Sequence, residues 1–425
     1  MKVAVVGSGI AGLTVAAGLA DRHEVTVFEA DDWIGGHTHT VDVEEDGRQV
    51  AIDTGFIVFN DWTYPNFIGM LERLGVAWQP SNMSFSLQCE RSGLEYNGTS
   101  VNSLFAQRRN ILRPSFLHMI WEILRFNREA PAFLAERDEH TTLGDWLDAK
   151  GYRGAFIEHY IVPMGRAIWS AEADAMLRFP AHFFIDFFKR HGFLSIDHRP
   201  VWQVVQGGSR EYVRKLIAPF RDSIRTATPV QRVRRLPHEV MLQTGTGEAL
   251  HFDAVVLACH SDQALGMLDD PSAAERELLA ALPYAANEAI LHTDASVLPR
   301  RPLARAAWNY HLRRDPAQGV ALTYDMNVLQ SLATRRRYLV SLNLADAIDE
   351  RAVLATFQYS HPVYTPAGVA AQKRHAEISG QRRTFYCGAY WRYGFHEDGV
   401  VSGLAALEQF RRWETDAQQP LSRVG

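Results

Sequence analysis

The stretch that decides the fold is MKVAVVGSGIAGLTVAAGLADRHEVTVFEA, residues 1–30. Its β-branched run Val3–Val6 predicts a short buried strand of a parallel sheet. Gly7, Gly9 and Gly12 follow directly as G-x-G-x-x-G. The first glycine of this pattern permits a tight turn, the second lets a pyrophosphate approach the backbone, and the third lets helix and strand pack closely. The stretch therefore predicts a dinucleotide-binding turn.

A second strand, EVTVFEA at residues 24–30, closes this unit. It ends at Glu29, 17 residues beyond Gly12, where a carboxylate accepts hydrogen bonds from a ribose diol. The helix between the two strands directs its N-terminal amides and the positive end of its dipole at the phosphates. The residues expected to contact the dinucleotide are therefore Gly7, Ser8, Gly9, Ile10, Ala11, Gly12, Glu29 and Ala30.

The composition is that of an ordinary globular protein. The chain has 425 residues, 47% of them apolar and 22% charged, and it is long enough for two or three domains. A net charge of −5 without a strongly basic block argues against nucleic acid as a partner. Three scattered cysteines fit a reducing compartment. No apolar run approaches the roughly 18 residues of a membrane span, so we expect a cytoplasmic protein.

The loop GGHTHT, residues 35–40, shows what kind of dinucleotide to expect. Gly35 and Gly36 followed by His37 and Thr38 resemble the flavin amine oxidase and phytoene desaturase superfamily, in which such a loop lies along the pyrophosphate and the flavin. The resemblance implies FAD as the cofactor and contacts from these four residues. The chain departs from the amine oxidases at His37, where they carry Arg, and a neutral imidazole compensates less phosphate charge than a guanidinium.

Two later segments extend the resemblance. VWQVVQGGSREYVRKLI, residues 201–217, places a glycine pair before a helix, as the superfamily does. The strands after it imply Val230 against the adenine and Ala258 near the first glycine turn. RRTFYCGAYWRYGFHEDGVVSGLAALEQF, residues 382–410, resembles the last cofactor motif of the superfamily, although Ala389 stands where an acidic residue is common. This motif implies cofactor contacts from Gly388, Asp398, Gly399 and Val400.

The order of these motifs predicts an α/β fold with a discontinuous cofactor domain. We expect a Rossmann-like FAD-binding domain with an inserted α+β substrate domain that contains a mixed sheet and helices. Residues 100–200 show helical periodicity, and residues 286–365 alternate as strands do. The predicted FAD-binding domain comprises residues 1–75, 203–285 and 380–413, the substrate domain residues 76–202 and 286–379, and a tail residues 414–425.

The aromatic loop before the last helix supplies the catalytic candidates, His396, Tyr393 and Glu397. With an unperturbed pKa near 6.5, His396 could exchange a proton at neutral pH. The alternative interpretation is that His396 is a hydrogen-bonded structural residue beside the cofactor. Glu397 could receive a charged amine. The loop's aromatic side chains are candidate walls of a substrate site or ordinary packing. His37 and His39 lack neighbouring ligands, so we expect no metal site.

Three observations favour an apolar substrate. The only lysine after Lys215 is Lys373, so the lysine that amine oxidases keep near the flavin has no counterpart. Six phenylalanines lie between residues 179 and 193. Three interpretations of this segment stay open, namely core packing, an apolar substrate tunnel and a peripheral membrane face. Stretches such as DTGFIVFNDWTYPNF (53–67) resemble a bacterial branch of amine oxidoreductase-like proteins, some of which are tied to modified membrane fatty acids.

The predicted function is an FAD-dependent oxidoreductase that dehydrogenates, desaturates or isomerises an apolar acyl-chain lipid. Two alternatives stay open, a flavin amine oxidase acting on a primary or secondary amine and a non-redox FAD-containing lipid-binding protein. The expected partner is a small-molecule or lipid substrate. We expect a cytoplasmic location, with peripheral contact to the inner face of the membrane where the substrate is a membrane lipid.

Overall fold

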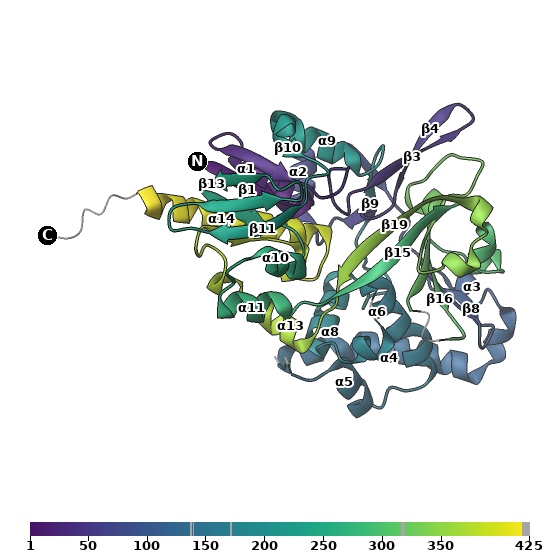
Figure 1. The fold of residues 1–425 in the computed structure, drawn as a ribbon. Helices are drawn as coiled ribbons and strands as arrows, with labels where there is room; N and C mark the ends of the chain where they lie inside the picture. The colour runs from purple at the N-terminus through teal and green to yellow at the C-terminus, as the bar shows by residue number, and fades with distance from the viewer. Residues whose placement is uncertain (137, 139, 171, 316–318, 419–425) are drawn as a thin grey trace.

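A five-stranded parallel sheet takes its strands from three separated parts of the chain (Figure 1). The structure, a computed structural model, describes residues 1–136, 138, 140–170, 172–315 and 319–418. The strand order is β10–β2–β1–β14–β20, and every neighbouring pair runs parallel. The strands are β1 (Lys2–Val6), β2 (Glu24–Phe28), β10 (Ile224–Arg225), β14 (Ala254–Leu257) and β20 (Thr384–Tyr386).

Both faces of this sheet are buried. Val3 and Val5 of β1 pack against helices, whereas Ala4 and Val6 pack against a three-stranded antiparallel sheet. Because side chains alternate along a strand, a strand covered on both faces reads as one continuous apolar run. The helices are α1 (Ile10–Leu19), α2 (Pro65–Leu74), α9 (Arg210–Ile217) and α14 (His396–Gln418), and the antiparallel strands are β11 (Val230–Arg235), β12 (Val240–Thr244) and β13 (Ala249–Phe252).

The first turns of α1 and α14 are pressed together. A Cβ atom on Gly399 would lie 2.6 Å from Ile10 Cγ2, and one on Gly403 would lie 2.7 Å from the carbonyl oxygen of Ala11. Small residues in α14 therefore let the two helices approach more closely than ordinary side chains permit.

A seven-stranded mixed sheet forms the centre of the second part of the molecule. Its order is β19–β15–β18–β17–β16–β7–β8, and only β16 and β7 among these pairs are parallel. We expected this sheet from residues 286–365 alone, but β7 and β8 come from the earlier segment. The strands are β7 (Phe85–Cys89), β8 (Glu95–Asn97), β15 (Tyr284–His292), β16 (Trp308–Leu312), β17 (Ala321–Asp325), β18 (Leu339–Leu342) and β19 (Val353–Pro362).

A helical lobe lies beside this sheet (Figure 1). Its core contains Phe183, Phe184, Phe187 and Phe188, all of them buried. The core interpretation of the phenylalanine-rich segment therefore holds for Phe183, Phe184 and Phe188, whereas Phe187 also lines an apolar pocket. The helices of the lobe are α4 (Pro114–Glu136), α5 (Leu143–Ala149), α6 (Val162–Trp169), α7 (Ala173–Leu177) and α8 (Ala181–Arg190), with a π-turn η2 (Ile157–Ile161) before α6.

Short elements connect these parts. They include the hairpin β3 (Thr40–Glu45) and β4 (Arg48–Asp53), the small sheet β5 (Phe59–Asn60), β6 (Trp78–Pro80) and β9 (Trp202–Val205), the helices α3 (Val101–Leu104), α10 (Ser261–Met267), α11 (Ala273–Ala280), α12 (Met326–Leu329) and α13 (Pro366–Gln372), and the single turns η1 (Arg108–Leu112), η3 (Ala218–Ser223), η4 (Ala295–Val297), η5 (Pro302–Ala304), η7 (Ala345–Ala347), η8 (Glu350–Ala352), η9 (His375–Glu377) and η10 (Ala389–Trp391).

Mixed sheets together with helices confirm the predicted α/β class. The predicted boundaries between a cofactor domain and a substrate domain stay a prediction. Of the predicted tail, residues 414–418 continue α14 to Gln418, and residues 419–425 lie outside the described residues. Within the described ranges, no helix has both the length and the apolar character required to cross a membrane.

Candidate active site

The glycine turn is too crowded for any side chain at two of its positions. A Cβ atom on Gly12 would lie 2.1 Å from the carbonyl oxygen of Gly7, and one on Gly7, where φ is +105°, would lie 2.9 Å from the carbonyl oxygen of Ala258. At Gly9, by contrast, a Cβ atom would meet nothing within 4 Å. The turn is therefore closed on the protein side, where Ala258 lies, and open at Gly9.

The first amides of α1 point into this open side without partners. Ile10, Ala11 and Gly12 occupy the first turn after the N-cap residue Gly9, and their N–H groups donate no hydrogen bond within the described part of the chain. Ile10 and Ala11 are buried. Because buried N–H groups are almost always paired, this end of α1 fits an anionic group such as the pyrophosphate of FAD.

Glu29 joins the glycine turn to the GGHT loop. Its Oε2 accepts from the amide of Ser8 at 2.9 Å and from Ser8 Oγ at 2.5 Å, and its Oε1 accepts from the amide of Asp31 at 3.0 Å. Ser8 Oγ in turn accepts from the amide of Gly35. The amide of Ser8, a predicted cofactor contact, is thus bonded to Glu29. A carboxylate has about four acceptor positions, so Glu29 keeps capacity for a ribose hydroxyl.

His37 is the member of the GGHT loop with an unsatisfied polar atom. Its Nε2 is buried and has no hydrogen-bond partner. The nearest rings are Tyr359, His361 and His260, with centroids 5.1, 5.4 and 6.3 Å away. Burial lowers the pKa of His37 well below 6.5 and that of His361 to about 4. At neutral pH these imidazoles are therefore uncharged, and His37 can offer a hydrogen bond but no positive charge.

No metal-binding arrangement occurs among the residues that the structure describes, since no three His, Cys, Asp or Glu side chains converge suitably.

Val230, the predicted adenine contact, begins β11 and packs with Phe28. It lies two residues beyond Thr228, whose amide donates to the carbonyl oxygen of Glu29. The structure therefore places Val230 near the end of β2 that carries Glu29.

The last cofactor motif is largely occupied by bonds within the protein. The amide of Gly388 donates to Ser402 Oγ at 3.0 Å, so it is not available to a cofactor as we expected. Asp398 Oδ2 accepts from the amide of Phe395 at 3.0 Å, and burial raises the pKa of Asp398 to about 6. Val400 is fully buried in the core beneath α1. These residues fix the start of α14 relative to the glycine turn.

His396 lies in a buried aromatic pocket. Its ring stacks on Phe56 with centroids 3.6 Å apart, and its Nε2 lies 2.8 Å from Tyr212 OH. Tyr212 OH is also 2.6 Å from Thr38 Oγ1, so a hydrogen-bonded chain joins the GGHT loop to α14. Burial lowers the pKa of His396 to about 3. The expectation that His396 exchanges protons near neutral pH is therefore corrected, because the folded protein holds it as a neutral imidazole.

Glu397 caps another helix. Its carboxylate accepts from the amide of Asn66 at 3.1 Å, from Asn66 Nδ2 at 2.7 Å and from the amide of Phe67 at 2.9 Å. Asn66 and Phe67 belong to the first turn of α2, where amides lack partners within the helix. The structure therefore gives Glu397 a structural role and not that of an amine-binding carboxylate.

Tyr393 faces the helical lobe. Its hydroxyl donates to Asp186, and its ring lies 4.6 Å from that of Phe183. It is absent from the residues that line the pocket described below. Cys387 is buried in the core under α1, and Lys373 is exposed at the C-terminal end of α13. Of the aromatic loop, Phe395 alone lines the pocket.

Asp53 is a buried carboxylate whose part in the site the sequence did not reveal. It accepts from Thr40 Oγ1 at 2.6 Å, from the amide and hydroxyl of Ser209, and from Gln330 Nε2 at 3.3 Å. Burial raises its pKa to about 6. Because Ser209 follows the glycine pair 207–208, Asp53 fixes that loop against β4. Asp53 follows the apolar residues 50–52 at the end of β4, where an aspartate is disfavoured in a strand, and this signal could have found it.

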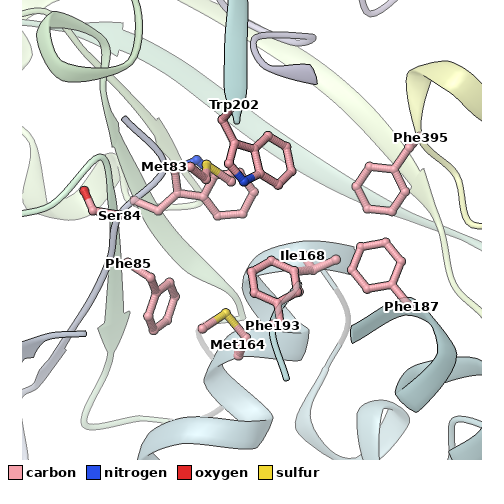
Figure 2. A pocket seen from close by; sticks show the side chains of 10 residues that line it. Met83, Ser84, Phe85, Met164, Ile168, Phe187, Phe193, Trp202 and Phe395 are labelled. Atoms are coloured by element: carbon pink, nitrogen blue, oxygen red, sulfur yellow. The ribbon is translucent and has the colours of Figure 1, made fainter. Parts of the chain in front are cut away.

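An apolar pocket is lined by residues of β7, β9, β16, α6 and α8 and of the loop before α14 (Figure 2). Phe395 and Phe187, with ring centroids 5.0 Å apart, stand at one side and Ser84 and Phe85 at the other. Its cavity is about 40 Å³, and an adjacent pocket of about 370 Å³ shares three lining residues with it and also contains Arg199. The inner pocket is lined by Met83, Ser84, Phe85, Met164, Ile168, Phe187, Phe193, Trp202, Trp308 and Phe395.

The parallel sheet and the glycine turn with its unpaired amides are features of a dinucleotide-binding fold. A family model described as "Flavin containing amine oxidoreductase" matches residues 10–340. The chain belongs to this family and is an FAD-dependent oxidoreductase, as the resemblance implied. The alternative of a non-redox lipid-binding protein is accordingly set aside.

Individual relatives show the same fold around different substrates. The chain is similar to the "Cyclohexylamine Oxidase from Brevibacterium oxydans IH-35A", with 15% identity, a TM-score of 0.70 and coverage of 98% of this chain and 99% of that one. It is also similar to a "CLA-producing fatty acid isomerase from P. acnes", with 16% identity, a TM-score of 0.66 and coverage of 96% and 98%. At such identities the likeness shows the fold alone.

A curated relative is the "Zeta-carotene desaturase" of Synechocystis sp. (strain ATCC 27184 / PCC 6803 / Kazusa), which is 40% identical over 76 residues. The match covers 18% of this chain and 15% of the desaturase. It therefore supports the shared family and leaves the substrate to be inferred from the pocket.

Proposed function

We propose that this oxidoreductase dehydrogenates, desaturates or isomerises an apolar acyl chain in the pocket of Figure 2. The observation that carries the proposal is the lining, in which none of the ten residues is charged. Each methylene buried there contributes about 0.8 kcal/mol. A cavity of about 40 Å³ admits only one or two methylenes, so the inner pocket would hold the reacting carbons and not the whole chain. The sulfur and aromatic side chains of Met83, Met164 and Phe193 adapt readily to such a chain.

The wider pocket suits the polar head of the substrate. It shares Met83, Phe193 and Trp202 with the inner pocket and adds the exposed Arg199. A guanidinium binds a carboxylate through paired hydrogen bonds. A fatty acid would therefore place its carboxylate at Arg199 and most of its chain in the wider pocket of about 370 Å³, with only the reacting carbons in the inner pocket.

The glycine turn holds the cofactor in this proposal. The unpaired amides of Ile10, Ala11 and Gly12 bind the pyrophosphate, Glu29 binds the ribose, and His37 donates from its Nε2. When bound, FAD supplies the hydride acceptor. Three of the predicted contacts, Ser8, Asp398 and Val400, would act indirectly by fixing the positions of the loops. The further predicted contacts are Gly7, Gly9, Ala30, Gly35, Gly36, Thr38, Val230, Ala258 and Gly399.

The aromatic loop positions the substrate. Asp398 accepts from the amide of Phe395, and the chain Thr38–Tyr212–His396 ties the start of α14 to the GGHT loop. Phe395 is thereby held at the pocket wall, where it orients the reacting carbon and excludes water. His396 serves as a neutral positioning residue in this arrangement, and Tyr393 supports the loop from the helical lobe.

Amine oxidation is the second candidate, because the fold likeness to cyclohexylamine oxidase has a TM-score of 0.70. An ammonium group needs a carboxylate or a polar cage, and the inner pocket lacks a carboxylate. The names of the fatty acid isomerase and the desaturase point to apolar substrates in those proteins. The lining therefore favours the acyl chain over the amine.

The test mixes the FAD-loaded protein anaerobically with oleic acid, linoleic acid or cyclohexylamine. We expect either bleaching of the visible flavin band or new double-bond positions in the recovered acyl chains. Ile168→Lys places a charge in the lining and should lower acyl turnover at least tenfold, whereas Leu303→Lys, at an exposed position, should not. Bleaching by cyclohexylamine without binding or turnover of either acid would reject the proposal.

A further inference from the structure

Exposed apolar side chains gather on one short segment of the helical lobe. Of the 13 large apolar residues that are exposed, six lie between residues 101 and 124, and Leu112 is 86% and Trp121 51% exposed. Single exposed apolar residues are normal, but a contiguous group marks an interaction surface. We name this surface the α4 face, and it consists of Val101, Ile111, Leu112, Leu117, Trp121 and Leu124.

The helix α4 is apolar on both of its sides, which is unusual for a helix at a protein surface. Its inner side buries Phe116 and Met119. Its outer side carries Leu117, Trp121 and Leu124, which are spaced four and three residues apart and so lie along one stripe. The inner side accounts for folding, and the outer side has no partner within the described residues that covers it.

The charges around the α4 face are predominantly positive. Residues 101–129 contain five arginines and two acidic residues. Glu122 is buried, and Glu129 forms ion pairs with Arg125 and Arg128, so Arg108, Arg109 and Arg113 supply the positive charge. Arg108, Arg109 and Arg128 are exposed, and the guanidinium of Arg125 lies 5.1 Å from the centroid of the Trp121 ring. The segment thus has a local charge opposite to the net charge of −5 of the whole chain.

We propose that the α4 face docks the protein on the surface of an anionic lipid bilayer. Leu112, Leu117, Trp121 and Leu124 would enter the boundary between headgroups and acyl chains, and the arginines would bind lipid phosphates. An apolar stripe flanked by basic side chains and containing tryptophan is the pattern of a helix that lies in the membrane interface. A second protein copy would carry the same positive charge on its face, so the charges favour lipid over self-association.

The position of the α4 face relative to the pocket adds a reason for docking. Phe85 packs against the core cluster that contains Phe116 and Met119, and it also lines the inner pocket. The inner side of α4 and the pocket wall therefore belong to one packed cluster. The proposal concerns binding and needs no acyl substrate, so its failure is distinguishable from failure of the proposed function.

Flotation of the full-length FAD-loaded protein with lipid vesicles tests the proposal. We expect binding to vesicles of equal parts phosphatidylcholine and phosphatidylglycerol and little binding to phosphatidylcholine alone. The double variant Leu112→Ser/Trp121→Ser should lose at least tenfold in affinity. The matched control Leu303→Ser/Leu354→Ser changes two exposed apolar residues outside the α4 face and should bind as the unchanged protein does.

Charge is tested separately with Arg108→Gln/Arg109→Gln. Each arginine near an anionic membrane is worth about fivefold in affinity, so this variant should lose roughly 25-fold at low salt and less at high salt. Vesicles with brominated acyl chains should quench tryptophan fluorescence, and Trp121→Phe should remove most of that quenching. Unchanged FAD content and thermal midpoint show that each variant folds.

Two results would overturn the proposal. One is equal flotation of the unchanged protein and the Leu112→Ser/Trp121→Ser variant. The other is a stable dimer in analytical ultracentrifugation that this variant dissociates, combined with no vesicle binding, since the α4 face would then be an interface between copies of the chain.

Discussion

Two helix N-termini in this protein use the same physics for opposite purposes. The first amides of α2 are taken by the carboxylate of Glu397, which arrives from α14. Those of α1 at Ile10, Ala11 and Gly12 are left without partners. Unpaired amides at a helix start attract anions in either case. The difference shows that α2 is completed by the protein itself, whereas α1 is left for the cofactor.

The strongest test of this comparison replaces two glycines of the turn separately. Gly12→Ala would place a Cβ atom 2.1 Å from a backbone oxygen. We expect this variant to lose about 3 kcal/mol of folding stability and to lose FAD binding. Gly9→Ala meets nothing within 4 Å, so it should leave the thermal midpoint of the FAD-free protein unchanged while blocking the approach of the pyrophosphate. FAD content and differential scanning calorimetry measure both effects. Normal FAD retention in Gly9→Ala would show that the open side of the turn is not the cofactor site.

The α2 side of the comparison is tested by Glu397→Ala. This change leaves the buried amide of Phe67 and the amide of Asn66 without an acceptor, and hydrogen bonds to a charged group are worth about 1.5–3 kcal/mol. We expect urea denaturation to show a stability loss of that size with FAD affinity little changed. A large loss of amine binding with normal stability would instead restore the role of Glu397 as an amine-binding carboxylate.

The two helix N-termini also show how much of the fold and of the site could be predicted from the sequence. The glycine spacing, the β-branched run and Glu29 predicted a strand–turn–helix–strand unit because local backbone geometry dictates it. The predicted roles of Glu397 and His396 were wrong. The partner of Glu397 is α2, about 330 residues away along the chain, and no local sequence pattern indicates that the two meet. Asp53 was missed for the same reason, because its partners Ser209 and Gln330 come from distant segments.

His396, beside Glu397, allows a test by pH. The unfolded imidazole has a pKa of 6.5, and burial lowers the folded value to about 3. Below pH 6.5 the unfolded state therefore binds a proton that the folded state does not. Stability should fall as the pH drops, by about 1.4 kcal/mol per pH unit from this residue, until pH approaches 3. His396→Gln keeps a hydrogen-bonding group for Tyr212 and should reduce this slope.

The measurement is the free energy of unfolding in urea at several pH values below 6.5. The exposed His238 provides the control, because His238→Gln removes a histidine without removing a buried one. Asp53 should act in the opposite direction, since its pKa is raised from 3.8 to about 6, and stability from this group falls as the pH rises through that window. An unchanged slope in His396→Gln would mean that the imidazole is solvated in the folded protein.

The smallest expected effect separates the two tasks of Glu29 at the α1 end. Glu29 accepts two hydrogen bonds from Ser8, and Ser8→Ala removes only the hydroxyl, which should weaken FAD binding by about 1 kcal/mol through the loop. Glu29→Ala removes the loop contacts and the proposed ribose contact, so it should cost FAD binding about 1–3 kcal/mol. FAD titration by fluorescence gives both affinities. If the two variants lose the same affinity, Glu29 acts only by holding the loop. A greater loss in Glu29→Ala assigns the remainder to a ribose contact of Glu29, distinct from the pyrophosphate contact of the open amides of α1.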